Sequence, residues 1–352
     1  MTDAPAEHRG INRLLAKIKI SMENKNFYEG EVFLIGIIYY MVVMSFLLAH
    51  QIFRTIYFRF SNQKRYAELL ELLFEGADNL ITAEQFTSGS DLALLIIDVL
   101  EKSKLEANKD FELWITRISS LVSRIEPNVI ERESIIAKSV KWSATGNNMS
   151  RLLGHPMMHK NIAKIMEKEK NYEQARHHYL LSKDGIGCAK ILLLLTRRAF
   201  ENEIDLVIVQ MVLQLLYIKE KETAQVTFNT YIMLHPKIQK SQPPFHAPLL
   251  NFLYYLLNLI DEPQAVAFKT LCDLYKTSLA RDPEFEKQLH RIGESYFGIV
   301  HSQPRAGGGG LFGDLFSQLF ADLGSDDDDV DDEELTTRII TGGVMTQSGD
   351  LD

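Results

Sequence analysis

Cysteine is scarce in this 352-residue chain, which contains only Cys188 and Cys272. Two cysteines so far apart in the sequence cannot form the disulfide framework of a small secreted domain or the ligand set of a cysteine zinc site. We expect both to pack as small apolar residues. This cysteine usage favours a reducing compartment.

The folded part of the chain also lacks a surplus of basic charge. The whole sequence has 38 basic and 47 acidic residues, a formal net charge of −9. Residues 301–352 contain twelve of the acidic and two of the basic residues, so residues 1–300 hold 36 basic and 35 acidic residues. A nearly neutral body gives no reason to expect nucleic-acid binding, which requires a basic face.

Catalytic and metal-binding patterns are missing as well. His155 and His159 could place two imidazoles on one helix face for a metal, but no third ligand is close in the sequence, so capping and packing roles are favoured. The glycines at 307–310 lack the preceding strand and the following Lys-Ser/Thr of a phosphate-binding loop. No nucleophile elbow or HExxH motif is found. We therefore expect neither an enzyme nor a bound cofactor.

A helical hairpin is the clearest positive signal, and it covers Gly154–Ala189. Proline suits the first turn of a helix, so a helix should begin near Pro156. The second helix has Tyr172-x-x-Ala175-x-x-x-Tyr179, with a small residue between two aromatic residues on one face. This is the tetratricopeptide arrangement, in which the small residue permits a close helix crossing. One such repeat cannot bury its apolar face alone, so similar hairpins should flank it.

Helical patterns continue on both sides of this hairpin, and no segment of appreciable length alternates with the period of a strand. The predicted fold is therefore all-α, a right-handed α-solenoid of tetratricopeptide-like hairpins. Residues Thr87–Ser90 are predicted to be a loop and helix cap. Helices are predicted at Ile11–Met22, Asp91–Lys102, Phe111–Ile125, Val129–Trp142, Cys188–Ala199, Ile204–Ile218, Lys221–Leu234, Pro248–Ile260, Gln264–Leu279 and Pro283–Phe297.

Composition divides the chain into three parts. The solenoid should occupy residues 1–300, with an N-terminal half at about 11–150 and a C-terminal half at about 151–300. A glycine-rich linker with a short amphipathic segment follows at 301–325. Residues 326–352 contain a dense run of acidic residues and should form a disordered tail.

An apolar run interrupts the N-terminal half. Val32–Ala49 contains eighteen residues without a charge, which reaches the length of a membrane span. Basic residues lie on both sides of the run, so little charge asymmetry would orient it in a membrane. Removing Gly30–Leu48 brings Phe27 within three residues of Ala49 and, with Phe53, restores the aromatic-x-x-Ala-x-x-x-aromatic spacing.

We therefore interpret residues 30–48 as an insertion into a repeat and predict that it is not a working transmembrane helix. An intron read through as coding sequence is the favoured origin, with a minor splice form second. The sequence leaves open whether the segment is present in the mature protein. Two other functional classes also stay open: a membrane-anchored adaptor that uses residues 32–49 as a span, and a tetratricopeptide module that binds a peptide in its groove.

Several motifs in order resemble the Golgi-to-ER traffic protein four family, over about residues 9–325. In that family the sequence around Glu29 and Ala49 is continuous, in agreement with the inferred insertion. The motifs are Lys141-Trp142-Ser143, Leu153-Gly154-His155-Pro156 with His159, Asn171-Tyr172-Glu173 through Tyr179, Asp184-Gly185 with Gly187-Cys188-Ala189, Pro243-Pro244-Phe245 with Pro248 to Phe252, and Arg291-Ile292-Gly293 with Tyr296-Phe297-Gly298.

This resemblance implies a cytosolic, non-enzymatic scaffold in the delivery of tail-anchored membrane proteins to the ER. In such proteins the N-terminal half binds the targeting ATPase through a basic face of the first hairpins. By position, that face corresponds here to Arg13, Lys17 and Lys19, with Arg54 matched less securely. Taken without the resemblance, the charges at Arg13, Lys17 and Lys19 are better explained as a solvated helix face. The resemblance makes a contact role for Arg13 and Lys17 an equally good interpretation.

The C-terminal half of such proteins holds a ubiquitin-like partner in fungi or the Bag-six chaperone in animals. The resemblance assigns Phe245, Leu249, Leu250 and Phe252 to this partner-binding half, and core packing is an equally good interpretation of each of them. The glycine linker followed by apolar pairs and acidic residues is of the animal type. It favours a Bag-six-type complex.

Overall fold

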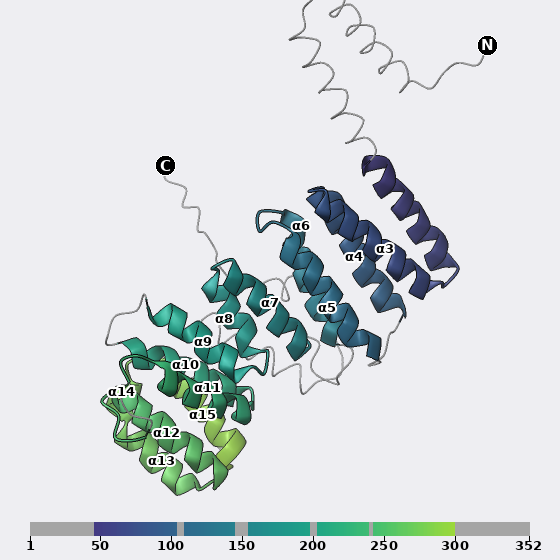
Figure 1. Cartoon of the computed structure of the whole chain (residues 1–352). Helices are drawn as coiled ribbons and strands as arrows, with labels where there is room; N and C mark the ends of the chain where they lie inside the picture. Colours follow the sequence, from purple (N-terminus) through teal and green to yellow (C-terminus); the bar gives the residue numbers. More distant parts are fainter. Residues whose placement is uncertain (1–45, 104–108, 145–153, 198–202, 239–241, 300–352) are drawn as a thin grey trace, which may run out of the picture. The chain divides into compact units, whose positions relative to one another are not determined.

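The structure is a computed structural model that describes residues 46–103, 109–144, 154–197, 203–238 and 242–299 (Figure 1). Within these ranges the secondary structure is helical and contains no strand, so the all-α prediction is confirmed for them. Contacts divide the described residues into two units. The first unit holds 46–103 with 124–132, and the second holds 109–123 with 133–299. The helix predicted at Ile11–Met22 and the predicted acidic tail lie outside the described residues.

A helix whose described part covers residues 46–62 opens the first unit. The next helices along the chain are α3 (Tyr66–Thr82), α4 (Phe86–Ser103), α5 (Lys109–Arg124) and α6 (Ile130–Ser143). They are followed by α7 (Pro156–Lys168), α8 (Tyr172–Leu180), α9 (Gly185–Thr196), α10 (Ile204–Tyr217), α11 (Lys221–Leu234), α12 (Pro248–Asp261), α13 (Ala265–Leu274), α14 (Lys276–Leu279) and α15 (Glu284–Phe297).

Local capping explains where the helices of the central hairpin begin. Pro156 is the first residue of α7, as predicted, and His155 caps this helix because its Nδ1 accepts a hydrogen bond of 3.2 Å from the Met157 amide. The Asn171 side chain caps α8 in the same manner. The Asp184 carboxylate caps α9 by accepting a hydrogen bond of 2.9 Å from the Gly187 amide.

Five of the short turns between helices share one backbone conformation. Each places a residue with positive φ two positions before the next helix starts, and in every case this residue is not glycine. Left-handed backbone usually favours glycine, so these turns are specified by the packing of the helices on either side. The residues are Lys64, Glu84, Lys170, Lys183 and Lys219, with φ between 55° and 64°.

In the first unit, α3 and α4 pack closely along their lengths. The prediction of a loop at Thr87–Ser90 is wrong, because α4 already begins at Phe86. Gly89 and Ser90 are buried in the crossing, and a Cβ atom at Gly89 would lie 2.6 Å from the Ile81 side chain. These small residues, which read as a loop in the sequence, let the two helices approach each other.

In the second unit, α10 is buried on most of its surface by α9, α11, α12 and α15. The prediction of one helix over Gln264–Leu279 is wrong, because Tyr275 divides it into α13 and α14. Tyr275 leaves the helical conformation (φ −102°, ψ 10°), and its ring packs against Phe252 with 5.7 Å between ring centroids. Backbone hydrogen bonds continue through this position, from the Tyr275 amide to the Leu271 carbonyl and from the Leu279 amide to the Tyr275 carbonyl, so the break is a local distortion of the backbone.

Candidate functional site

Arg54 is the one predicted ATPase-contact residue that the structure places, since Arg13, Lys17 and Lys19 lie outside the described residues. Arg54 is on the helix at 46–62, and its side chain is about half exposed. Its Nη1 lies 3.7 Å from the Asp91 carboxylate, which also lies 2.8 Å from His50 Nε2. The Arg54 charge is thus partly offset within the chain and still reaches solvent.

A second polar contact joins the same helix to α4, seven residues further along both helices. The Tyr57 hydroxyl donates a hydrogen bond of 2.6 Å to Asp98, and Lys102 Nζ lies 2.8 Å from the Tyr57 hydroxyl and 2.7 Å from Asp98. Burial and the hydrogen bond to Asp98 raise the pKa of Tyr57, and the hydrogen bond to Asp98 raises the pKa of Lys102. Repeated at a spacing of seven, these contacts fix how the helix lies on α4.

The helix at 46–62 keeps several apolar side chains exposed. Leu48, Ile52 and Phe58 have more than half of their surface in solvent. No helix within the described ranges is long and apolar enough to cross a membrane. Most of the run at Val32–Ala49 lies outside those ranges.

The four residues assigned to the partner-binding half all point into the core. Leu249 and Phe252 are fully buried, and Phe245 and Leu250 nearly so. Asn251 holds the preceding loop on α12, because its Oδ1 accepts from the Phe245 amide at 2.8 Å and its Nδ2 donates to the Phe245 carbonyl at 2.9 Å. Their packing favours the core interpretation. A role for these side chains in binding a partner stays a prediction.

Sequence reasoning missed three exposed apolar residues beside these buried ones. Val266 and Leu274 on α13 are 78% and 74% exposed, and Tyr255 on α12 is 47% exposed. Residues 266, 270 and 274 lie within about 80° of one another around a helix, so the first and last share one side of α13. The available signal was an apolar residue recurring on the otherwise polar face of α13.

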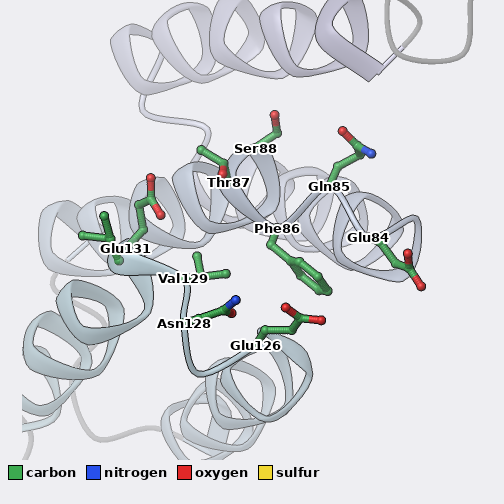
Figure 2. A pocket seen from close by; sticks show the side chains of 10 residues that line it. Glu84, Gln85, Phe86, Thr87, Ser88, Glu126, Asn128, Val129 and Glu131 are labelled. Carbon is green, nitrogen blue, oxygen red and sulfur yellow. The ribbon is translucent and has the colours of Figure 1, made fainter. Parts of the chain in front are cut away.

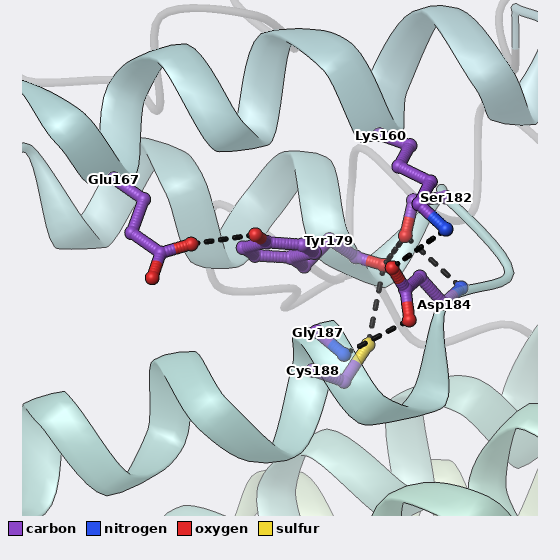
Figure 3. A network of polar contacts seen from close by, with 7 residues as sticks. All are labelled: Lys160, Glu167, Tyr179, Ser182, Asp184, Gly187 and Cys188. Carbon is purple, nitrogen blue, oxygen red and sulfur yellow. Dashed lines mark hydrogen bonds and ion pairs between the residues drawn. The ribbon is translucent and has the colours of Figure 1, made fainter.

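The motif around Asp184 forms a network of contacts, here called the clasp, that joins α7, α8 and α9 (Figure 3). Lys160 Nζ lies 3.0 Å from the Asp184 carboxylate that caps α9. Gly187 faces the Tyr179 ring so closely that a Cβ atom would lie 2.3 Å from the ring. The Tyr179 hydroxyl in turn donates a hydrogen bond of 2.6 Å to Glu167. This motif, one of those that carry the family resemblance, therefore serves helix packing.

Cys188 takes part in the same clasp and is not poised for chemistry. Its Sγ donates a hydrogen bond of 3.2 Å to the Tyr179 carbonyl (Figure 3). Burial raises the pKa of the Cys188 thiol to about 12, so the reactive thiolate is disfavoured. The expected packing role of Cys188 is confirmed.

The histidines suggested for a metal serve other contacts. His155 caps α7, and His159 pairs with His178 through Nδ1 atoms 2.9 Å apart in the interior. Burial holds the pKa of His178 well below its usual value, so His178 is uncharged near neutral pH. The described residues contain no group of three or more His, Cys, Asp or Glu side chains that could hold a metal ion.

Comparison with known proteins identifies the family of this chain. The sequence model of the family described as Golgi to ER traffic protein 4 matches residues 63–320. The chain is 37% identical to the Golgi to ER traffic protein 4 homolog of Oryzias latipes over 326 residues, which is 92% of both chains. It is 35% identical to the Homo sapiens homolog over 319 residues, 90% of this chain and 89% of the relative.

A solved structure supports the fold independently. The crystal structure of C. therm. Get4 is similar to this chain with a TM-score of 0.66 and 19% sequence identity, and the match covers 91% of this chain and all of the other. On the strength of its sequence matches, the chain belongs to the Golgi to ER traffic protein 4 family.

Proposed function

We propose that this chain is a non-enzymatic scaffold in the post-translational delivery of tail-anchored membrane proteins to the ER. The observation that carries the proposal is membership of the Golgi to ER traffic protein 4 family over about nine tenths of the chain. In the proposed role, the protein holds a targeting ATPase and a chaperone complex together. Its own side chains then need only bind the two partners.

The targeting ATPase is proposed to bind the N-terminal half through Arg13, Lys17, Lys19 and Arg54. The support is the basic character of the first predicted helix in a nearly neutral body, together with the half-exposed Arg54 on the following helix. All four positions precede residue 63, where the match to the family's sequence model begins. The contact therefore needs its own test in this chain.

The C-terminal half is proposed to hold a ubiquitin-like partner or a Bag-six-type chaperone. Val266 and Leu274 on α13, with Tyr255 on α12, are exposed and can give such a partner an apolar anchor. The burial of Leu249 and Phe252 supports an indirect role for them, in which the core keeps α12 in place. Aromatic and aliphatic side chains at the centre of an interface commonly supply much of its binding energy.

The proposed place of action is the cytosol. Carbonate extraction of the full chain from a cell membrane fraction separates this from an anchored adaptor that uses residues 32–49 as a span. A scaffold should be released by carbonate. Retention in the membrane after extraction would favour the anchored adaptor.

The scaffold role is tested by binding experiments on the full chain with both partners purified. R13E/K17E should weaken binding to the ATPase by at least about tenfold at low salt and leave the C-terminal partner bound, because exposed charge contacts are screened by ions. V266D/L274D should weaken binding of the C-terminal partner and leave ATPase binding unchanged, since it places charges in an apolar contact. Size-exclusion chromatography and calorimetry measure both effects.

Matched controls are available elsewhere on the surface. K168E/K170E reverses two exposed lysines, and M233D/L234D changes two exposed apolar residues at the end of α11. Both controls should bind the two partners as the unmodified chain does. If the full chain binds neither partner, or if the controls weaken binding as much as the test variants, the proposal is wrong.

A further inference from the structure

An open pocket lies on the first unit, where the turn between α3 and α4 meets the turn between α5 and α6 (Figure 2). Its volume is about 480 Å³, within the range of sites that hold small ligands or a few side chains. The proposed contacts of the scaffold do not use it. The lining residues are Glu84–Ser88 from the first turn and the start of α4, and Glu126 with Asn128–Glu131 from the second turn and the start of α6.

The pocket carries negative charge that no side chain within the described ranges neutralises. Glu84, Glu126 and Glu131 line it, and no lysine or arginine is among the lining residues. Within the described residues, none of these three carboxylates has an ion pair or a hydrogen bond. The neighbouring Arg124 is instead paired with Asp78 on α3.

The helix ends at the pocket offset only part of this charge. The N-termini of α4 and α6 both lie at its wall, and each contributes roughly half a positive charge. Favourable interaction with the helix ends accounts for carboxylates near these positions. Three carboxylates still exceed what two helix ends can balance, and about two negative charges are left over.

Apolar surface lies between these charges. Figure 2 shows the Phe86 ring directed toward the side on which the Glu84 and Glu126 carboxylates lie. Ile130, which also lines the pocket, is 87% exposed, the highest value among the large apolar side chains of the described residues. Ile130, Phe86 and three carboxylates line the same pocket, so one ligand can make apolar contacts and ion pairs there at the same time.

We propose that this pocket docks a short segment of a partner protein in which an apolar side chain stands next to lysine or arginine. The apolar side chain would contact Phe86 and Ile130, while the basic side chains would pair with Glu84, Glu126 and Glu131. Nucleic acid and anionic lipid surfaces carry charge of the same sign as the pocket and are disfavoured. The site is independent of the proposed ATPase contact, which depends on basic side chains.

Fluorescence anisotropy on the full chain tests the proposal. The probe is a short labelled peptide of lysines and leucines, compared with a counterpart that has glutamate at every lysine position. The lysine peptide should bind, and E84Q/E126Q/E131Q should weaken it at least about tenfold at low salt. I130S should weaken it about threefold to tenfold through lost apolar contact, while circular dichroism shows that the variants are folded.

The matched control is E222Q/E262Q/E286Q, which removes the same charge from exposed glutamates of the second unit. It should change the affinity less than about twofold. Equal weakening by both triple variants, or equal binding of the glutamate peptide, would overturn the proposal, because the attraction would then be a general effect of net charge.

Photo-crosslinking locates the bound peptide directly. With a photoreactive group at one leucine position, crosslinks at residues 84–88 and 126–131 support the proposal. Crosslinks confined to the acidic residues 326–352 would overturn it. Sedimentation of the full chain addresses another occupant: a dimer that E84Q/E126Q/E131Q dissociates would mean that a second copy fills the pocket, and would also overturn the proposal.

Discussion

The helix at residues 46–62 and α9 are both held by neighbouring helices, but they are buried to different extents. The former is joined to α4 by polar side chains near the surface, through His50 with Asp91 and Tyr57 with Asp98. Each helix also takes part in a contact between a glycine and an aromatic ring, Gly76 against Phe53 and Gly187 against Tyr179. Most residues of α9 are buried, whereas Tyr57 is the only buried residue in the described part of the other helix. Polar contacts near solvent contribute little net stability, whereas close packing contributes much.

This difference assigns separate properties to the two regions. The helix at 46–62 should separate from its neighbours at low free-energy cost and leaves both charged and apolar side chains at its surface. The region around α9 should open only when the second unit unfolds. A binding surface near 46–62 can adapt to a partner, while the C-terminal core offers a rigid support. Four predictions test this contrast, from the largest expected effect to the smallest.

Phe252→Ala should destabilise the protein by about 3–5 kcal/mol, because it removes a fully buried ring from the rigid region. Tyr255→Ala on the same helix removes a half-exposed ring and should cost less than about 1.5 kcal/mol. Urea denaturation followed by circular dichroism measures both values. Similar losses for the two variants would contradict the division between a buried core and an exposed surface on α12.

Gly187→Ala should lower the free energy of unfolding by about 1–3 kcal/mol, because the added methyl group would lie 2.3 Å from the Tyr179 ring. Gly298→Ala is the control. Its φ is 62° and nothing lies within 4 Å of the added atom, so only the backbone penalty of roughly 1–2 kcal/mol applies. When Tyr179→Leu is also present, the loss of stability caused by Gly187→Ala should become smaller, whereas the loss caused by Gly298→Ala should stay the same. Double-mutant cycles measure both differences.

Acidification should destabilise the α8 region. Burial, and to a lesser extent the charge of Arg176, lowers the pKa of His177 to about 4. The unfolded chain has a histidine pKa near 6.5, so it binds the proton first as the pH falls. Stability should therefore be unaffected above about pH 6.5 and decline between about pH 6.5 and 4, by roughly 1–2 kcal/mol at pH 5.

Urea midpoints at pH 7 and pH 5 measure this loss, and the variant His177→Gln separates it from the titration of carboxylates. The variant should show a smaller difference between the two pH values. An identical pH dependence in both proteins would show that His177 does not differ in protonation between the folded and unfolded states.

Tyr57→Phe should have the smallest effect, a loss of about 0.5–1.5 kcal/mol, because Asp98 keeps its ion pair with Lys102 after the hydroxyl is removed. Amide hydrogen exchange is the informative measurement. Exchange should accelerate in residues 46–62 and stay unchanged in α9 and α10. Uniform acceleration over the whole chain would mean that the helix at 46–62 opens only with global unfolding.

Helix positions were predictable from the sequence wherever apolar periodicity and a local start signal agreed. Pro156 and Pro248 each fill the first position of a helix, and the pattern at Lys221–Leu234 gave both ends of α11. The loop expected at Thr87–Ser90 failed for a physical reason. Glycine and serine are common both in turns and where two helices cross closely, so their presence alone does not tell a turn from a crossing. Here the contact of Gly89 with Ile81 shows that the segment lies in a helix crossing.

Site residues were harder to predict than helices. Apolar residues such as Leu249 and Val266 have the same chemistry, and one is buried while the other is 78% exposed. Their difference depends on which helix covers each of them. The pocket at Glu84 and Glu126 joins two turns about forty residues apart, and no local pattern links them.

The sequence by itself determined the helical class, the hairpin repeat and the family, because periodicity, capping residues and ordered motifs are local properties of the chain. The tertiary structure decided which members of those motifs are exposed. In the folded protein Asp184 and Gly187 serve helix capping and packing, and the predicted helix is divided at Tyr275. Glu84, Glu126 and Glu131 line one pocket together with Ile130. Burial and charge balance depend on contacts between distant residues, and these form only when the helices pack.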